Sequence, residues 1–80
     1  MNQEKLAKLN TLIAEVFSVE EKNVKPDASF VYDLDADSFK RVVFMAEVQD
    51  LTGIELDAAQ LKYMETVKDL YEALKGWLEA

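Results

Sequence analysis

The stretch Leu34-Asp35-Ala36-Asp37-Ser38-Phe39 stands near the middle of an 80-residue chain, directly before a long run of apolar residues at helical spacing. Asp37 is a good helix N-cap, so we expect Ser38 in the first turn of a helix that covers residues 37–52. The sequence contains no His and no Cys, so it lacks the usual bases that activate a serine nucleophile. Ser38 is therefore better suited to modification by another enzyme than to catalysis, and an ordinary place in the first helical turn is the simpler alternative.

Apolar residues at helical spacing predict further helices before and after this one. The first covers residues 3–17, a short one covers residues 57–63 with Asp57 as its cap, and the last covers residues 66–79. A long connection, residues 18–37, contains Pro26 and no regular pattern. We therefore expect an all-α fold, a four-helix bundle with three longer helices, one short helix and a long first loop, built by residues 1–80 as a single domain.

The formal net charge of −7 narrows the classes of partner. Phosphates of nucleic acids and anionic membranes would be repelled, whereas proteins with basic patches would be attracted. No apolar run approaches the roughly 20 residues that span a membrane, and the start of the chain does not resemble a signal peptide. We expect a monomeric, cytoplasmic protein that binds other proteins.

The residue types also argue against a metal centre. Without His or Cys the chain cannot build a usual zinc site. Asp33-x-Asp35-x-Asp37 imitates the start of a calcium-binding EF-hand loop, which needs Gly at its sixth position and Glu at its twelfth. Ser38 and Phe44 occupy those two positions. We therefore expect no metal ligands.

The helix over residues 37–52 carries two apolar stripes. Phe39, Val42, Val43 and Ala46 form one, and Phe44, Met45, Val48 and Leu51 form the other. A helix that is apolar on two sides is either central in its bundle or exposes one side to a partner. Since so small a domain cannot bury the helix all round, we expect one stripe to be exposed.

Several motifs in chain order resemble the acyl carrier protein family. Residues 34–39 are similar to its Leu-Gly-Ala-Asp-Ser-Leu motif, and residues 28–34 to its Ala-Ser-Phe-x-x-Asp-Leu. Residues 53–56 resemble its Gly-Ile-Glu-Ile, and Thr66-Val67 resembles the Thr-Val that opens its last helix. The resemblance implies a non-catalytic carrier that holds acyl intermediates as thioesters for fatty-acid or specialised lipid or polyketide-type biosynthesis.

The resemblance also implies a cofactor, partners and site residues. Phosphopantetheine from coenzyme A would be attached to Ser38 by a phosphopantetheinyl transferase, with Asp37 and Phe39 as flanking recognition residues. Acyl-transferring or acyl-modifying enzymes with basic and apolar docking surfaces would be the other partners. Candidates for an acyl-chain pocket are Phe44, Met45, Val48, Leu61 and Tyr71, although ordinary core packing explains these residues equally well.

Departures from the family pattern concentrate around Ser38. Asp35 replaces the family's Gly, which removes backbone freedom and adds charge. Phe39 replaces a Leu, and Val43 stands where a Glu is typical. The candidate partner-binding residues surround these changes: Asp35, Phe39, Lys40, Arg41, Val42, Val43, Ala46, Glu47 and Asp50.

Alternative classes remain open at this point. Asp37-Ser38-Phe39 also looks like the Asp-Ser-Phe of D-alanyl carrier proteins, and a peptidyl carrier would share the same attachment chemistry. A helical interaction module with unmodified Ser38 is a further alternative. A mass measurement of the modified protein separates the carriers from this module.

Overall fold

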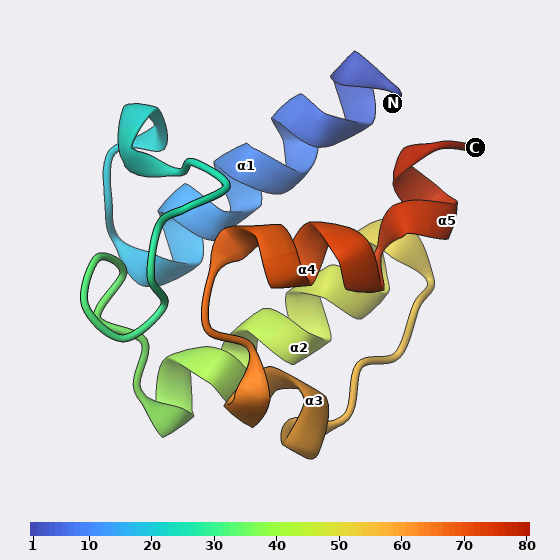
Figure 1. Ribbon diagram of the computed structural model, residues 1–80. Coiled ribbons are helices and arrows are strands. Elements are labelled where there is room, and N and C mark those ends of the chain that lie inside the picture. Colours follow the sequence, from blue (N-terminus) through green and yellow to red (C-terminus); the bar gives the residue numbers. More distant parts are fainter.

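The computed structural model describes residues 1–80, which form helices and no strand. The elements are α1 (Gln3–Phe17), the 3-10 helix η1 (Glu21–Asn23), α2 (Ser38–Thr52), α3 (Ala58–Tyr63), α4 (Val67–Ala73) and α5 (Lys75–Leu78). In Figure 1, α1, α2 and α4 gather around a common centre, and α3 closes the end where α2 begins. None of the helices combines the length and the apolar character needed to cross a membrane. The all-α bundle with a long first loop is thus confirmed.

The last predicted helix, residues 66–79, is divided at Leu74, where φ is −104° and ψ is 14°. Gly76 lies just beyond the division and has a low helix propensity. The final turn is instead held by the start of α1, because the Asn2 N–H donates to the Leu78 carbonyl at 2.8 Å. Lys5 Nζ also donates to the Trp77 carbonyl at 3.1 Å. These contacts join residues more than seventy positions apart, so the helical spacing of residues 66–79 does not reveal them.

Helix ends follow the predicted capping residues. Asp37 caps α2, and its carboxylate accepts the Lys40 N–H at 2.7 Å. Gly53 ends α2 in the left-handed region, with φ 75°. Asp57 and Gln60 form a reciprocal capping box at the start of α3, with distances of 2.7 and 2.9 Å. Local sequence therefore determines where α2 begins and where it ends.

The connection over residues 18–37 is an ordered loop that packs on the helices. Four of its apolar residues, Val24, Ala28, Phe30 and Leu34, are buried. An isolated antiparallel bridge pairs Ser29 with Thr66, and the Phe30 N–H donates to the Glu65 carbonyl at 3.0 Å. These contacts tie the loop to the segment between α3 and α4, so the approach to α2 is fixed by tertiary structure.

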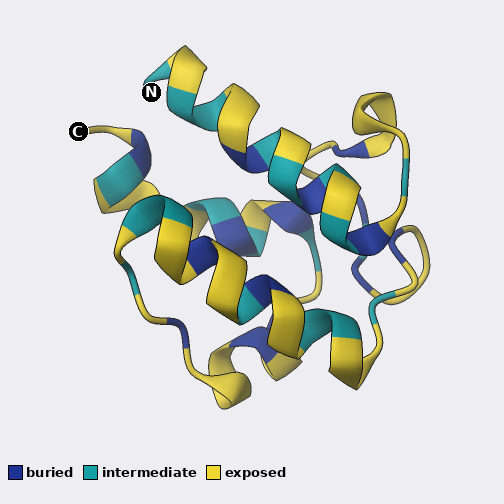
Figure 2. Cartoon of the chain, turned by 180° about the vertical axis from the view of Figure 1, so that it is seen from behind, coloured by how far each residue is buried: buried dark blue, intermediate teal, exposed yellow.

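The core contains sixteen buried residues, all of them apolar. Aromatic rings link its parts: Phe17 of α1 lies 5.3 Å from Phe44 of α2 and 5.8 Å from Phe30 of the loop, centroid to centroid. Helix α2 contributes Phe44 and Val48, which are completely buried, while Phe39 and Val42 of the other stripe are exposed. Figure 2 shows this alternation of buried and exposed segments along the helices. The prediction of one buried and one exposed stripe on α2 is correct.

Candidate functional site

Ser38 is the first residue of α2, and it is exposed. Neither its backbone N–H nor that of Phe39 donates to another group of the protein, since the first N–H groups of a helix have no partner within it. Free N–H groups and the positive end of the helix dipole both favour a phosphate at this point. The surroundings of the Ser38 hydroxyl therefore fit a phosphodiester-linked group. Of the two carboxylates nearby in the sequence, Asp35 and Asp37, that of Asp37 already accepts the Lys40 N–H as the helix cap.

The loop before Ser38 is held by buried anchors and by local hydrogen bonds. Leu34 is completely buried, and its N–H donates to the Ser29 carbonyl at 3.0 Å. The Asp33 carboxylate accepts the Ser29 N–H at 2.7 Å. The Ala36 N–H donates to the Phe30 carbonyl at 2.8 Å. The backbone that leads to Ser38 is therefore held in place by these contacts, while the Ser38 side chain is exposed to solvent.

Asp35, two residues before the cap, has a φ of 51°. This left-handed conformation favours glycine, and aspartate is among the few other residues that tolerate it. Asp35 thus adopts the left-handed backbone conformation that glycine favours, although its Cβ makes this conformation less favourable in energy. The Asp35 side chain is exposed, three positions before Ser38 in the chain.

A groove of about 360 Å³ begins at Ser38 and runs between α2 and α3. It is lined by Ser38, Arg41, Val42 and Met45 of α2 and by Ala58, Leu61 and Lys62 of α3. Of the five candidates for an acyl-chain pocket, Met45 and Leu61 thus lie beside the candidate attachment site. Phe44 and Val48 are on the adjacent buried side of α2, in the core.

Tyr71 lies apart from this groove. It belongs to α4, and its hydroxyl donates a hydrogen bond to Asn10 Oδ1 of α1. Partial burial raises the pKa of Tyr71 above its usual value, and the bond to Asn10 offsets part of that rise. The structure therefore brings together two of the five pocket candidates, leaves two in the core and gives the fifth a contact between α1 and α4.

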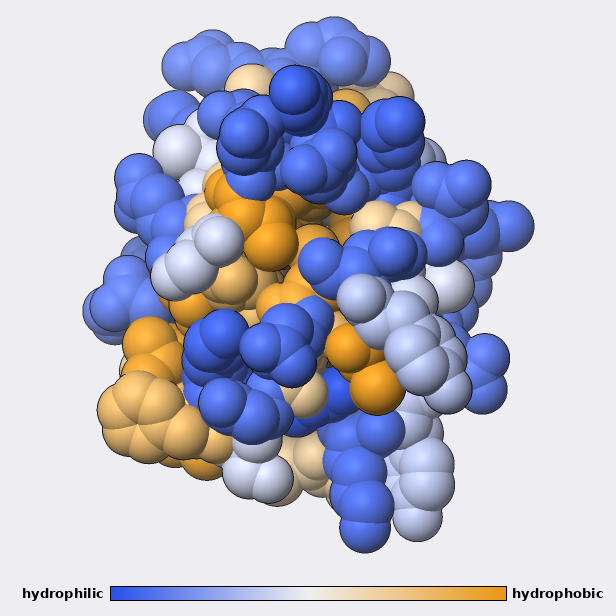
Figure 3. Space-filling model, turned by 90° about the vertical axis from the view of Figure 1, so that its left-hand side faces the viewer, coloured by the Kyte–Doolittle hydropathy of each residue, from blue (hydrophilic) through white to orange (hydrophobic).

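The exposed stripe of α2 contains three large apolar side chains. Phe39 is 77% exposed, Val42 62% and Val43 36%, and Ala46 is also exposed. Figure 3 shows apolar side chains gathered among charged ones on the side of the molecule that carries the long loop and the start of α2. Contiguous exposed apolar surface of this kind commonly marks an interaction site.

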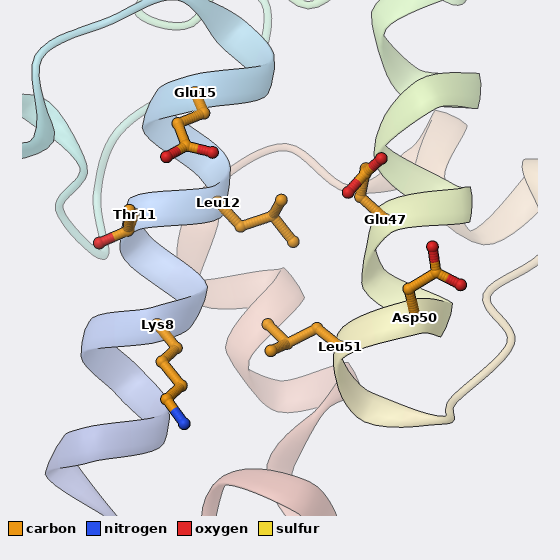
Figure 4. A pocket seen from close by; sticks show the side chains of 7 residues that line it. All are labelled: Lys8, Thr11, Leu12, Glu15, Glu47, Asp50 and Leu51. Carbon is orange, nitrogen blue, oxygen red and sulfur yellow. The ribbon is translucent and has the colours of Figure 1, made fainter.

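Two other predicted partner-binding residues, Glu47 and Asp50, line a second groove on α2. This groove, of about 330 Å³, lies between α1 and α2 and also includes Lys8, Thr11, Leu12, Glu15 and Leu51. Figure 4 shows Leu12 and Leu51 pointing into it from opposite walls, with Glu15 and Glu47 above them. Its lining thus combines two apolar side chains, Leu12 and Leu51, with three acidic ones, Glu15, Glu47 and Asp50.

Arg41 makes internal contacts that the sequence does not reveal. Its Nη1 donates to the Leu61 carbonyl, and its guanidinium lies 5.7 Å from the centre of the Phe30 ring. Both Arg41 and Lys40 are only partly exposed. Lys62, which sequence reasoning missed, lies next to Leu61 on the other wall of the groove. Its only sequence signal is a basic residue at the end of a short capped helix.

Acidic side chains are frequent near Ser38 but do not converge. No group of three or more His, Cys, Asp or Glu residues is arranged so that it could hold a metal ion. Asp33 and Asp37 each accept a backbone N–H instead. The acidic residues of this loop therefore act in turns and caps.

Comparison with known proteins finds relatives over most of the chain. Residues 7–74 match the family described as "Phosphopantetheine attachment site". An acyl carrier protein of Thermosynechococcus vestitus is 32% identical over 81 aligned positions, which cover all of both chains. One from Thermobifida fusca is 40% identical over 62 residues, 78% of each chain. The meromycolate extension acyl carrier protein of Mycolicibacterium aurum is 37% identical over 68 residues, 85% of this chain and 70% of that one. The matched range includes Ser38 and both walls of the α2–α3 groove.

Proposed function

Because the chain belongs to the acyl carrier protein family, we propose that Ser38 carries a phosphopantetheine arm on which acyl intermediates are held as thioesters for partner enzymes. Phosphopantetheine is the prosthetic group that this membership implies. The arm supplies a terminal thiol, which this cysteine-free chain does not itself contain. Residues 1–80 would then act as one carrier domain without catalytic groups of its own.

The observation that carries this proposal is the exposed Ser38 hydroxyl at the start of α2, at the mouth of the α2–α3 groove. In the loading step a bond forms between Ser38 Oγ and the phosphorus that bears the arm. The pyrophosphate bond of coenzyme A breaks, adenosine 3′,5′-bisphosphate leaves, and a base of the transferase takes the hydroxyl proton. Ser38 needs only to be reachable for this step, because the transferase supplies the catalytic groups.

We also propose where partner enzymes dock. Members of this family interact with transferases and acyl-processing enzymes. The exposed apolar stripe of Phe39, Val42, Val43 and Ala46 lies beside the acidic walls formed by Glu15, Glu47 and Asp50. A partner with an apolar patch flanked by basic side chains matches both features. Fatty-acid or specialised lipid or polyketide-type biosynthesis is the proposed setting, with the cytoplasm as its place.

The test of the attachment is a mass measurement. Purified protein is incubated with coenzyme A and a broad-specificity phosphopantetheinyl transferase, and its mass is then determined. We expect the wild type to gain one phosphopantetheine group and Ser38→Ala to gain none. Ser18→Gly is the matched control, because it removes another exposed hydroxyl at a position whose φ of 56° suits glycine. A wild type without mass gain, or a gain that persists in Ser38→Ala, would overturn the assignment.

A further inference from the structure

Two cationic side chains, Arg41 of α2 and Lys62 of α3, line the groove that begins at Ser38. The same two residues also line an adjoining groove of about 460 Å³, which extends toward Ser29, Tyr32 and Thr66 of the loop and the α3–α4 connection. Arg41 and Lys62 therefore stand between the two grooves. No acidic residue lines the first groove, and Glu65 is the only one that lines the second.

Neither cation is paired with a carboxylate, although the chain has 16 acidic residues and only 9 basic ones. The ion pairs present are Lys8 with Glu4 and Lys22 with Glu20, both on the surface. Arg41 donates to a carbonyl and lies against the Phe30 ring, and the Lys62 ammonium lies 6.0 Å from the centre of the Tyr63 ring. These partners are neutral, so two neighbouring positive charges remain uncompensated within an acidic protein.

Arg41 is held in a position that leaves donors free. Its contacts with the Leu61 carbonyl and the Phe30 ring fix the guanidinium, and only one of its N–H groups is used in a hydrogen bond. A guanidinium has five N–H donors in a planar fork that matches the oxygens of a phosphate. Because less side-chain freedom is lost on binding, a pre-positioned arginine is a better oxyanion ligand than a mobile one.

The position of Arg41 relative to Ser38 determines which anion it can meet. The two residues are three positions apart on α2, so their side chains leave the helix on the same side, and both line the same groove. Lys62 approaches that groove from α3. An oxyanion attached to Ser38 Oγ would therefore lie at the end of the groove where these donors are available.

We propose that Arg41 and Lys62 bind the phosphodiester of the arm attached to Ser38 and direct the arm into the α2–α3 groove, over Met45 and Leu61. This inference rests on the proposed function, since it requires the arm at Ser38. The chemistry that Arg41 and Lys62 recognise is that of an oxyanion. A carboxylate at the far end of a dicarboxylic acyl group would offer the same chemistry, and the experiment below separates the two sources.

The experiment uses the wild type, Arg41→Gln, Lys62→Gln and the control Lys75→Gln. Lys75 is an exposed lysine of α5, at the other end of the bundle from α3, so the control removes the same charge elsewhere. Each protein is prepared without the arm, with the arm, and with the arm carrying a dicarboxylic acyl group, and the mass confirms each form. The first measurement is the melting temperature of all three forms. The second is the phosphorus resonance of the loaded form, recorded with increasing salt.

We expect the arm to raise the melting temperature of the wild type and of Lys75→Gln by a few degrees. This gain should be mostly lost in Arg41→Gln and Lys62→Gln. A purely structural role of Arg41 would lower the melting temperature of both forms equally and leave their difference unchanged. The phosphorus resonance of the wild type should move with salt toward that of the same phosphodiester in the unfolded loaded protein. In Arg41→Gln and Lys62→Gln the phosphorus resonance should lie near this reference value already at low salt.

The possible outcomes separate the two levels of the proposal. Failure of the wild type to gain mass overturns the proposed function, and this inference with it. Loading with an unchanged melting difference and resonance in both variants overturns the inference alone. A response that appears only when the arm carries a dicarboxylic acyl group would assign the cations to the acyl group, which also overturns the phosphodiester assignment. Because Lys62 is exposed, Lys62→Gln decides the question even if Arg41→Gln does not fold.

Discussion

Helix α2 separates two grooves of similar volume and opposite charge. The groove toward α1 holds about 330 Å³ and is lined by Glu15, Glu47 and Asp50 with one lysine. The groove toward α3 holds about 360 Å³ and is lined by Arg41 and Lys62 with no acidic residue. At about 100° per residue, the α2 residues of the two grooves lie on opposite sides of the helix. One helix thus offers an acidic side and a basic side.

The comparison teaches how one short chain can serve two kinds of contact. The exposed stripe around Val43 lies between the two sides, opposite the buried stripe of Phe44 and Val48. An acidic surface suits basic partner enzymes, whereas a phosphodiester near it would be repelled. Placing the cations on the other side of α2, next to Ser38, resolves this conflict. The helical period places the acidic residues Glu47 and Asp50 on one side of α2 and Arg41 on the other.

The largest expected effect on stability comes from truncating Phe44, the buried side chain of α2 that packs in the core behind both grooves. Phe44 is completely buried and contacts the Phe17 ring. Phe44→Ala should lower the free energy of unfolding by about 3 to 5 kcal/mol, because the lost burial adds to the cost of a cavity. Phe39→Ala, on the exposed stripe, should change it by less than about 0.5 kcal/mol. Urea unfolding followed by circular dichroism measures both, and equal losses would contradict the assignment of the two stripes.

The next effect concerns the backbone where the basic groove begins. Asp35 has a φ of 51°, a conformation that costs most residues roughly 1 to 2 kcal/mol. Asp35→Gly should therefore leave stability unchanged or raise it by up to about 1 kcal/mol, and Asp35→Ala should lower it by about 1 kcal/mol. Thermal unfolding of the two variants provides the measurement. An alanine variant as stable as the glycine variant, or more stable, would contradict a backbone cost at this position.

A smaller effect is expected at the exposed stripe between the grooves. Val43→Glu should weaken binding of a cognate enzyme roughly fivefold, about 1 kcal/mol, if Val43 contributes apolar contact there. The variant should at the same time engage a general fatty-acid synthase better, since a Glu is typical at this position of the family. Val31→Glu is the matched control, because Val31 is an exposed valine of the loop outside the stripe. Unchanged affinity of Val43→Glu for both enzymes would argue against a specialised docking surface.

The smallest effect lies in the connection that leads from the α3 wall of the basic groove into α4. The Asp69 carboxylate accepts the N–H groups of Thr66 and Glu65, at 3.1 and 2.9 Å, and these bonds hold the pKa of Asp69 below its usual value. A lowered pKa stabilises the fold above the unfolded pKa of about 3.9. That contribution is lost as the pH falls through the lower folded value.

Acid unfolding of Asp69→Asn tests this contribution. The variant should lose less stability than the wild type when the pH falls from about 5 toward the acid end. Glu72→Gln, an exposed acid of the same helix, should follow the wild type. If the stability of Asp69→Asn and that of the wild type fall equally with pH, Asp69 does not contribute to the pH dependence of folding.

Much of the fold was predictable because it depends on local rules. Capping by Asp37, Gly53 and Asp57 and the period of the apolar residues place α1, α2 and α3 within a residue or two of their observed bounds. The last helix was predicted as continuous because its apolar spacing is unbroken. The segment after the division at Leu74 is held by hydrogen bonds from Asn2 and Lys5, which a local pattern cannot contain.

The candidate site was predictable to a different extent for each residue. Ser38 and its cap follow from the motif and from the start of a helix, and the stripe of Phe39, Val42 and Val43 follows from periodicity. Lys62 and the internal contacts of Arg41 did not follow, because they require α3 to lie against α2. Tyr71 was assigned to the same pocket as Met45, but its position depends on the contact between α4 and α1.

The sequence by itself determined which residues of this protein share a side of each helix, because side-chain direction along a helix depends only on the position in the chain. It also determined the family, through motifs that keep their order along the chain. Only the tertiary structure decided which helix each side meets. That decision placed Lys62 beside Arg41 at the groove of Ser38, and Glu15 beside Glu47 and Asp50 at the groove on the far side of α2. Such pairings are made by packing between segments distant in sequence.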